Sequence, residues 1–217
     1  MTISFTEENY LKTIYHLSSP DKETVNTNAI SESLRTKAAS VTDMLRKLAE
    51  KELINYEKYQ GVTLTDSGKA KAITIIRKHR LWEVFLVDKL DFKWDEVHDL
   101  AEELEHIHSE KLINKLDEFL GFPNVDPHGD PIPDKNGVLK SPDLVPVSKM
   151  LVGESGKISG VREHSKEFLQ YLEKTGLILG QSIMIKEKIP FDGSIILSME
   201  EKIHTISREV AKNLLVS

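Results

Sequence analysis

Apolar residues recur every three or four positions over residues 6–17, which is the period of an amphipathic helix. The same period predicts shorter helices over residues 26–34 and 36–50. The inner face of the third helix is predicted to consist of Val41, Leu45 and Leu48. Thr6 is the predicted N-cap of the first helix, because a threonine before the first apolar residue accepts a free backbone N–H. Helices that follow one another across short turns are typical of a helix-turn-helix unit.

Strand-like alternation then replaces the helical period. Residues 53–58 and 62–64 alternate on either side of a turn that contains Gly61, which predicts a β-hairpin. A long helix is predicted over residues 65–89. Helices and a hairpin in this order favour a winged helix-turn-helix that binds DNA, and a generic small α+β domain is the alternative.

The rest of the chain contains one further long helix and then a β-rich segment. Leucine and isoleucine recur at helical spacing over residues 94–120. Six of the eight prolines fall in residues 121–147, which predicts a linker or an irregular surface segment. Residues 148–217 alternate in short runs separated by glycines, with a short helix predicted over residues 165–174. Several short strands in so short a segment predict a small β-barrel.

Charge and composition narrow the classes of function. The net charge of the 217 residues is −6, but residues 1–80 carry +3 and the remainder carries −9. A basic front part before an acidic remainder is compatible with a DNA-binding head. The absence of cysteine excludes disulfides, thiol catalysis and cysteine-based zinc sites. Neither a signal peptide nor an apolar run of membrane-spanning length is found, so we expect a cytoplasmic protein without membrane attachment.

Imidazole and carboxylate side chains occur at helical spacing on two successive predicted helices. His79 and Glu83 lie one turn apart on the first. Four more such residues follow on one face of the next: His98, Glu102, Glu105 and His106. These donors suit Mn²⁺, Fe²⁺ or Zn²⁺, and a solvated acidic helix with incidental histidines is the alternative. Four other histidines are interpreted as surface or packing residues: His16, His108, His128 and His204.

Taken together, these motifs resemble the diphtheria toxin repressor family of metal-dependent transcriptional regulators. The matching stretches are residues 8–15, 64–68, 77–81, 98–106, 121–133 and 153–216. The resemblance implies a mainly α fold with a small β part, in three domains. These are a winged helix-turn-helix DNA-binding domain at 1–72, a helical metal-binding and dimerisation domain at 73–140, and an SH3-like β-barrel at 141–217.

The resemblance also implies two metal sites. The first consists of Asn9, Glu102, Glu105 and His106, with helix capping as the alternative role of Asn9. The second consists of His79, Glu83 and His98, completed from the barrel by His164 and Glu167. Lys12 stands where manganese-sensing members carry a further acidic ligand, and Glu102 stands where iron-sensing members carry a cysteine. A carboxylate favours harder ions than a thiolate does, so Mn²⁺ is the expected cofactor, Fe²⁺ the alternative, and Zn²⁺ is expected to bind in the test tube.

The expected function is metal-dependent repression of metal-homeostasis genes by a homodimer bound to double-stranded operator DNA. The candidate DNA contacts are Lys37, Ala38, Ala39, Ser40, Thr42, Asp43, Arg46, Lys47, Lys58 and Tyr59. Neither an enzyme nor a small organic substrate is expected. One alternative is a di-metal carboxylate enzyme, because Glu103-x-x-His106 and Glu105-x-x-His108 match its helical element. The other is a metal-independent adaptor module built on the barrel.

Overall fold

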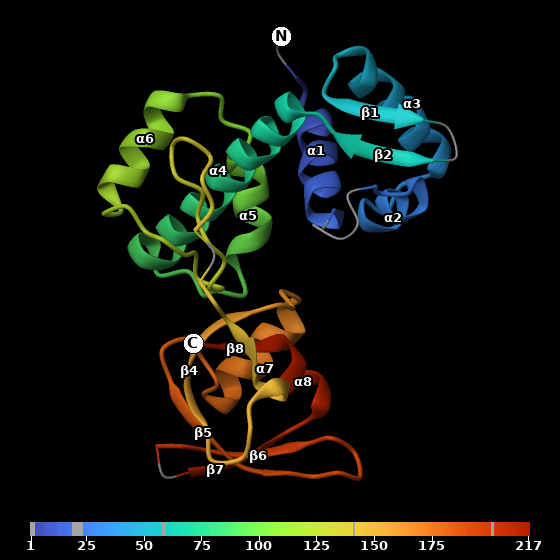
Figure 1. Cartoon of the computed structure of the whole chain (residues 1–217). Coiled ribbons are helices and arrows are strands. Elements are labelled where there is room, and N and C mark those ends of the chain that lie inside the picture. The colour runs from blue at the N-terminus through green and yellow to red at the C-terminus, as the bar shows by residue number, and fades with distance from the viewer. Residues whose placement is uncertain (1–2, 19–23, 58–59, 141, 201) are drawn as a thin grey trace. The chain divides into compact units, whose positions relative to one another are not determined.

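The computed structural model describes residues 3–18, 24–57, 60–140, 142–200 and 202–217. The chain forms two compact units (Figure 1). The head unit comprises Met1–His79, Glu102–Glu110 and Pro133–Val138, and the body unit comprises Arg80–Ala101, Lys111–Ile132 and Leu139–Ser217. In the part of the chain that the structure describes, no helix has both the length and the apolar character needed to cross a lipid bilayer.

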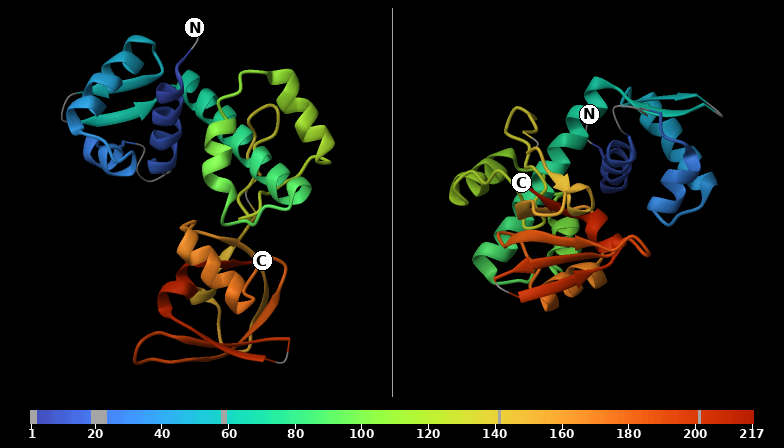
Figure 2. Two further views of the ribbon diagram at one scale, coloured as in Figure 1. Left: turned by 180° about the vertical axis from the view of Figure 1, so that it is seen from behind. Right: turned by 60° about the horizontal axis from the view of Figure 1, so that its bottom comes forward.

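The head unit begins with three helices and a hairpin, as the sequence predicts. Its elements are α1 (Phe5–Leu17), α2 (Thr27–Ser33), α3 (Ala38–Glu50), β1 (Ile54–Glu57), β2 (Gly61–Leu64) and the first part of α4 (Asp66–Leu90). The helices α1 to α3 and the hairpin gather round one core (Figure 2), where Leu11, Ile30 and Leu45 have no exposed surface. This arrangement is a winged helix-turn-helix, and the predicted inner face of α3 is confirmed.

The N-cap of α1 is Ser4, so the prediction of Thr6 is wrong. The Ser4 hydroxyl accepts the backbone N–H of Glu7 at 3.3 Å, and the Glu7 carboxylate accepts that of Ser4 at 2.7 Å. This reciprocal pair satisfies two N–H groups that a helix end otherwise leaves free. Because α1 begins at Phe5, Asn9 lies beyond its first turn and has no capping role.

The single helix predicted over residues 94–120 is wrong, because the structure has two helices there, α5 (Val97–Leu104) and α6 (Glu110–Phe119). Glu105 and His106 lie in the turn after α5 and do not continue its face. Neither glycine nor proline marks this break in the sequence. The helix ends where the side chain of Glu105 turns inward to partners that are distant in the chain.

The body unit contains a small antiparallel barrel of the SH3-like kind. Its described strands are β3 (Val145–Pro146), β4 (Ser155–Val161), β5 (Ser182–Lys188), β6 (Ile195–Met199), β7 (Lys202–Ile206) and β8 (Leu214–Val216), in the order β3-β8-β4-β5-β6-β7. The core is closed by the short 3-10 helix Val147–Lys149, by α7 (Lys166–Thr175) and by α8 (Arg208–Asn213). Leu172, Ile185 and Leu197 are fully buried in it. The strands and the short helix predicted for this segment are confirmed.

Candidate metal centres and DNA-binding surface

Glu105 is the centre of a buried charge cluster in the head unit. Its side chain has no exposed surface, and a buried carboxylate is costly unless it is paired. One of its oxygens accepts a hydrogen bond from His79 Nδ1 at 2.6 Å. Burial alone would raise the pKa of Glu105, but the His79 hydrogen bond and the charge of Lys12 outweigh it and hold the pKa below its usual value. His79, predicted for the second site, thus contacts a residue of the first.

Lys12 supplies a positive charge to this cluster, and the buried Lys78, whose Nζ lies 3.9 Å from Glu8 Oε1, supplies another. Its Nζ lies 2.7 and 2.8 Å from the two carboxylate oxygens of Glu105 and 3.1 Å from Glu102 Oε1. The Lys12 side chain is only 11% exposed. An ammonium group from α1 therefore joins two of the predicted metal ligands.

Glu8 is a buried partner of His106 that the sequence analysis missed. Its Oε2 lies 2.5 Å from His106 Nδ1, and the ring of Phe5 stacks on the imidazole with centroids 4.6 Å apart. Its Oε1 lies 3.6 Å from Nδ1 of His108, whose side chain is half exposed. Glu8 and Lys12 are four residues apart on α1, so helical spacing could have placed Glu8 on this face.

Of the predicted ligands of the first site, Glu105 is fully buried whereas the Glu102 side chain is 45% exposed, and within the described residues the ligands do not converge on one point. The side-chain oxygen of Asn9 is buried, and none of the described residues donates a hydrogen bond to it. A buried oxygen without a donor fits a cation ligand, because it is otherwise desolvated without compensation. Within the described residues, Glu102, Glu105 and His106 are not a group whose ligand atoms all lie within 4.8 Å of one another. Instead, Lys12 contacts the carboxylates of Glu102 and Glu105, and Glu8 contacts the imidazole of His106.

A second cluster lies in the body unit and includes two residues that the sequence analysis did not assign to a metal. Glu83, Asp126 and His128 are buried, and each offers a ligand atom within 4.8 Å of the other two. Glu83 Oε1 lies 3.7 Å from Nδ1 of His128 and 3.7 Å from Nδ1 of the half-exposed His98. The interpretation of His128 as a surface or packing residue overlooked this grouping. In the sequence Asp-Pro-His-Gly at 126–129, the proline and the glycine predict a turn, and a turn holds the two donors Asp126 and His128 close together. This pattern could have identified the pair from the sequence alone.

The turn around Gly129 positions both donors. Asp126 Oδ1 accepts the backbone N–H groups of His128 and Asp130 at 2.8 and 3.0 Å. Gly129 has a φ of +89° and packs so closely on β4 that a Cβ would lie 2.2 Å from the backbone oxygen of Ser159. Only glycine fits there, and the turn carries His128 into the interior of the body unit.

Like charges crowd the second cluster. Burial raises the pKa of Asp126 to about 7, and the carboxylates of Glu83 and Asp130 add to this effect. Arg80, with Nε 3.5 Å from Asp126 Oδ2, offsets only part of it. Burial alone would lower the pKa of His128, but the hydrogen bond and charge of Glu83 raise it. A bound cation would relieve this crowding of acidic groups.

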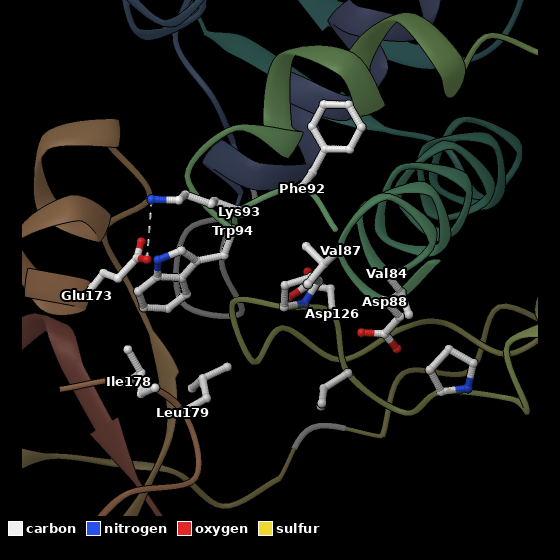
Figure 3. Close-up of a pocket in the computed structure, with 13 residues that line it drawn as sticks. Val84, Val87, Asp88, Phe92, Lys93, Trp94, Asp126, Glu173, Ile178 and Leu179 are labelled. Carbon is white, nitrogen blue, oxygen red and sulfur yellow. Dashed lines mark ion pairs between the residues drawn. The ribbon is translucent and has the colours of Figure 1, made fainter. Parts of the chain in front are cut away.

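Trp94 contacts His128 of this cluster and also lines a cavity of about 430 Å³. His128 Nε2 donates to the backbone oxygen of Trp94 at 2.8 Å, which leaves Nδ1 facing Glu83 as the ligand nitrogen. Figure 3 shows the cavity, with Lys93 and Glu173 paired at 3.6 Å beside the indole ring. Its wall is mainly apolar, so the cavity differs in character from the charge clusters.

Of the two barrel residues predicted for the second site, His164 lies at its margin. His164 Nε2 is 3.9 Å from Asp130 Oδ2, and its ring centroid is 5.1 Å from that of His128. Glu167 is exposed in the first turn of α7. Among the residues that the structure describes, neither His164 nor Glu167 belongs to a group of three donors close enough together for one ion.

The helix α3 presents the predicted DNA-binding residues on one polar side. Those that are exposed are Lys37, Ala38, Ala39, Ser40, Asp43, Arg46 and Lys47. Thr42 is half-buried, and its hydroxyl donates to the backbone oxygen of Ala38 at 3.0 Å. Arg46 and Asp43 form an exposed ion pair at 3.4 Å. The predicted contacts Lys58 and Tyr59 on the hairpin lie outside the described residues.

A winged helix-turn-helix whose third helix exposes Arg46 and Lys47, in a chain that buries carboxylate and imidazole clusters, defines a class of DNA-binding proteins with sites for divalent cations. Comparison with known families places the chain within that class. Residues 2–62 match the N-terminal DNA-binding domain of the iron-dependent repressors, and residues 65–134 match their metal-binding and dimerisation domain. Residues 145–217 match the FeoA domain.

Known relatives agree with these matches. A solved manganese-dependent transcriptional repressor in complex with manganese is 33% identical, with a TM-score of 0.85 over 97% of this chain and 98% of that one. The iron-dependent repressor IdeR of Mycobacterium leprae is 28% identical over 95% of this chain and 94% of its own length. A probable metal transport system membrane protein of Chlamydia trachomatis is 44% identical over 86 residues, which are 19% of its length. The chain belongs to the diphtheria toxin repressor family of iron- and manganese-dependent transcriptional repressors, with a C-terminal FeoA domain.

Proposed function

We propose that this protein represses genes of metal-ion homeostasis by binding double-stranded operator DNA as a homodimer, in a manner that requires Mn²⁺, with Fe²⁺ as the alternative ion. The observation that carries the proposal is the match of residues 2–62 and 65–134 to the two domains of the iron-dependent repressors. Relatives described as repressors favour this function over a di-metal enzyme or an adaptor module. A cytoplasmic location belongs to the same proposal, because operator DNA is found there.

The residues that would hold the first ion are Asn9, Glu102, Glu105 and His106. The buried Asn9 oxygen without a donor and the buried, ionised Glu105 support this assignment. When bound, the ion supplies a positive charge for carboxylates that otherwise need a protein cation. Its ligands come from α1 and from α5 with the turn that follows it, so ligation favours the arrangement that brings these segments together. The DNA-binding head is thereby coupled to metal occupancy.

The residues that would hold the second ion are Glu83, His98, Asp126 and His128. The buried group of Glu83, Asp126 and His128 supports this assignment, and Asp126 and His128 are additions to the predicted set. His79, His164 and Glu167 stay predictions for this site. Oxygen and imidazole donors without a thiolate favour Mn²⁺ over softer ions, although raw affinity for Zn²⁺ is expected to be higher in the test tube. We also propose that residues 1–72, 73–140 and 141–217 serve as the functional domains.

The double variant Asp126→Asn, His128→Gln is expected to bind about one Mn²⁺ fewer per chain, because both changes remove donors from the second cluster. Elemental analysis of the desalted, Mn²⁺-loaded protein measures this number. The matched comparison is His164→Ala, Glu167→Ala, which is expected to retain the ion. Full Mn²⁺ content in the first variant would contradict the assignment, and loss in the second would return the barrel pair to the ligand set.

The variant Arg46→Ala is expected to weaken binding to operator DNA by about tenfold and to lower its dependence on salt, because a guanidinium on the recognition helix binds phosphate or a guanine edge. Fluorescence anisotropy with labelled duplex DNA at two salt concentrations measures both effects. Lys212→Ala in α8 removes the same charge from a half-exposed side chain of the barrel and serves as the control. Equal affinities of the two variants would argue against α3 as the recognition helix.

A further inference from the structure

Lys12 has no role in the proposed function, yet its ammonium contacts two of the four proposed ligands of the first metal site. The oxygens that it contacts at 2.7, 2.8 and 3.1 Å belong to Glu105 and Glu102, which are two of the four proposed ligands. Glu102 belongs to α5 and Glu105 to the turn that follows α5, whereas Lys12 belongs to α1. The ammonium therefore makes the same connection between segments that the proposed ligands would make through an ion.

We propose that Lys12 is a tethered competitor of the metal ion, whose ammonium neutralises Glu102 and Glu105 in the metal-free protein and withdraws before these carboxylates bind an ion. The inference rests on the proposed function. An ion bound to these carboxylate oxygens would lie next to the ammonium, and two cations at such a separation repel one another strongly where water is largely excluded. The flexible four-carbon stem of lysine allows the charged group to move away without losing its proton.

The arrangement of the other ligands agrees with this competition. In the described residues, the ligand atoms of Glu102, Glu105 and His106 do not all lie within 4.8 Å of one another; Lys12 contacts the two carboxylates, and Glu8 contacts the imidazole. Lys12 thus has two effects. It keeps the fully buried Glu105 paired when the metal is scarce, and it raises the metal concentration at which the site fills.

A purely structural role for Lys12 predicts the opposite sign. If the ammonium only held Glu102 and Glu105 in place for the metal, its removal would disorganise the site and weaken metal binding. If it competes, its removal strengthens metal binding. The direction of the change in Mn²⁺ affinity therefore separates the two roles.

The experiment is a Mn²⁺ titration of full-length protein, with free Mn²⁺ followed by its electron paramagnetic resonance signal. Lys12→Gln is expected to lower the Kd of the first site by about tenfold or more, whereas Lys12→Arg, which keeps the cation, is expected to bind like the unmodified protein. Lys51→Gln is the matched control, because Lys51 pairs with Glu7 of α1 at 2.6 Å away from the proposed ligands. An unchanged or higher Kd in folded Lys12→Gln overturns the inference.

A measurement on the unmodified protein tests the same idea if Lys12→Gln does not fold. Acetylation of lysines by a water-soluble reagent, read by mass spectrometry, is expected to be slow at Lys12 with chelator and faster with Mn²⁺, while Lys51 does not change. Slower or equal acetylation of Lys12 with Mn²⁺ overturns the inference.

The variant Glu105→Gln separates this inference from the proposed function. If it binds Mn²⁺ as well as the unmodified protein does, the proposed site fails; if it loses an ion while Lys12→Gln behaves as unmodified, only the competitor role fails.

Discussion

Replacing Glu105 by glutamine is expected to abolish metal-dependent DNA binding. Glutamine has nearly the same size and keeps one oxygen, but it removes the charge that Lys12 and His79 hold in the metal-free protein and that a cation would hold in the loaded protein. We expect the affinity for operator DNA in the presence of Mn²⁺ to fall roughly a hundredfold, which is the upper range of coupling between two sites. Anisotropy titrations of labelled DNA with and without Mn²⁺ measure the effect.

Glu103→Gln is the matched control for this prediction. Glu103 is an exposed residue of the same helix α5, so its loss removes the same charge without touching the cluster. Circular dichroism and thermal unfolding of both variants show whether the fold survives, which matters because Glu105 is fully buried. Metal-dependent DNA binding by folded Glu105→Gln with an unchanged Mn²⁺ midpoint would rule out Glu105 as a ligand.

Replacing Asp126 by asparagine is expected to make the stability of the metal-free protein less dependent on pH. Burial and neighbouring carboxylates raise the pKa of Asp126 from 3.8 to about 7 in the folded protein. The neutral acid therefore stabilises the fold at low pH, and this contribution is lost as the pH rises from about 4 through about 7. At about 1.4 kcal/mol for each unit of pKa, the loss amounts to roughly 4 kcal/mol.

Urea unfolding in chelator at pH 5 and pH 8 measures the part of this loss that falls above pH 5, about two pKa units or roughly 2.7 kcal/mol, as the difference between the variant and the unmodified protein. Asparagine keeps the Oδ1 atom that accepts the backbone N–H groups of His128 and Asp130. Asp134→Asn is the control, because Asp134 Oδ1 accepts two backbone N–H groups in the same way, at 2.8 and 2.9 Å, on an exposed turn. If Asp126→Asn gains no stability over the unmodified protein between pH 5 and pH 8, Asp126 is not held neutral in the fold.

The sequence predicted the winged helix and the barrel because local patterns determine both. The inner face of α3 repeats every three or four residues, and the strands of the barrel alternate between glycines. The break between α5 and α6 could not be predicted in this way, because the helical period continues through it. At this break Glu105 is buried against Lys12 and His79, and no local pattern contains those contacts.

The candidate sites were predicted in part, for a similar reason. Glu102 and Glu105 were identified from the sequence by a helical spacing, although Glu105 lies in the turn after α5 and reaches the cluster from there. Asp126 and His128 were not, because a proline-rich segment was interpreted as irregular surface, whereas close packing of Gly129 on β4 carries it into the interior. The contact of Lys12 with two carboxylates could not be predicted from the sequence either; the family resemblance implied only that a basic residue stands where manganese-sensing members carry an acidic one.

The central claim is that a divalent ion switches this protein to its DNA-binding form. The most direct test is a mobility-shift titration of duplex DNA from the region upstream of its own coding sequence, with Mn²⁺ increased stepwise, followed by chelator, and with Fe²⁺ in a parallel anaerobic series. The account predicts a shift that appears with the ion, disappears with chelator and is absent for Glu105→Gln. A shift of equal strength in chelator and in Mn²⁺ would contradict it.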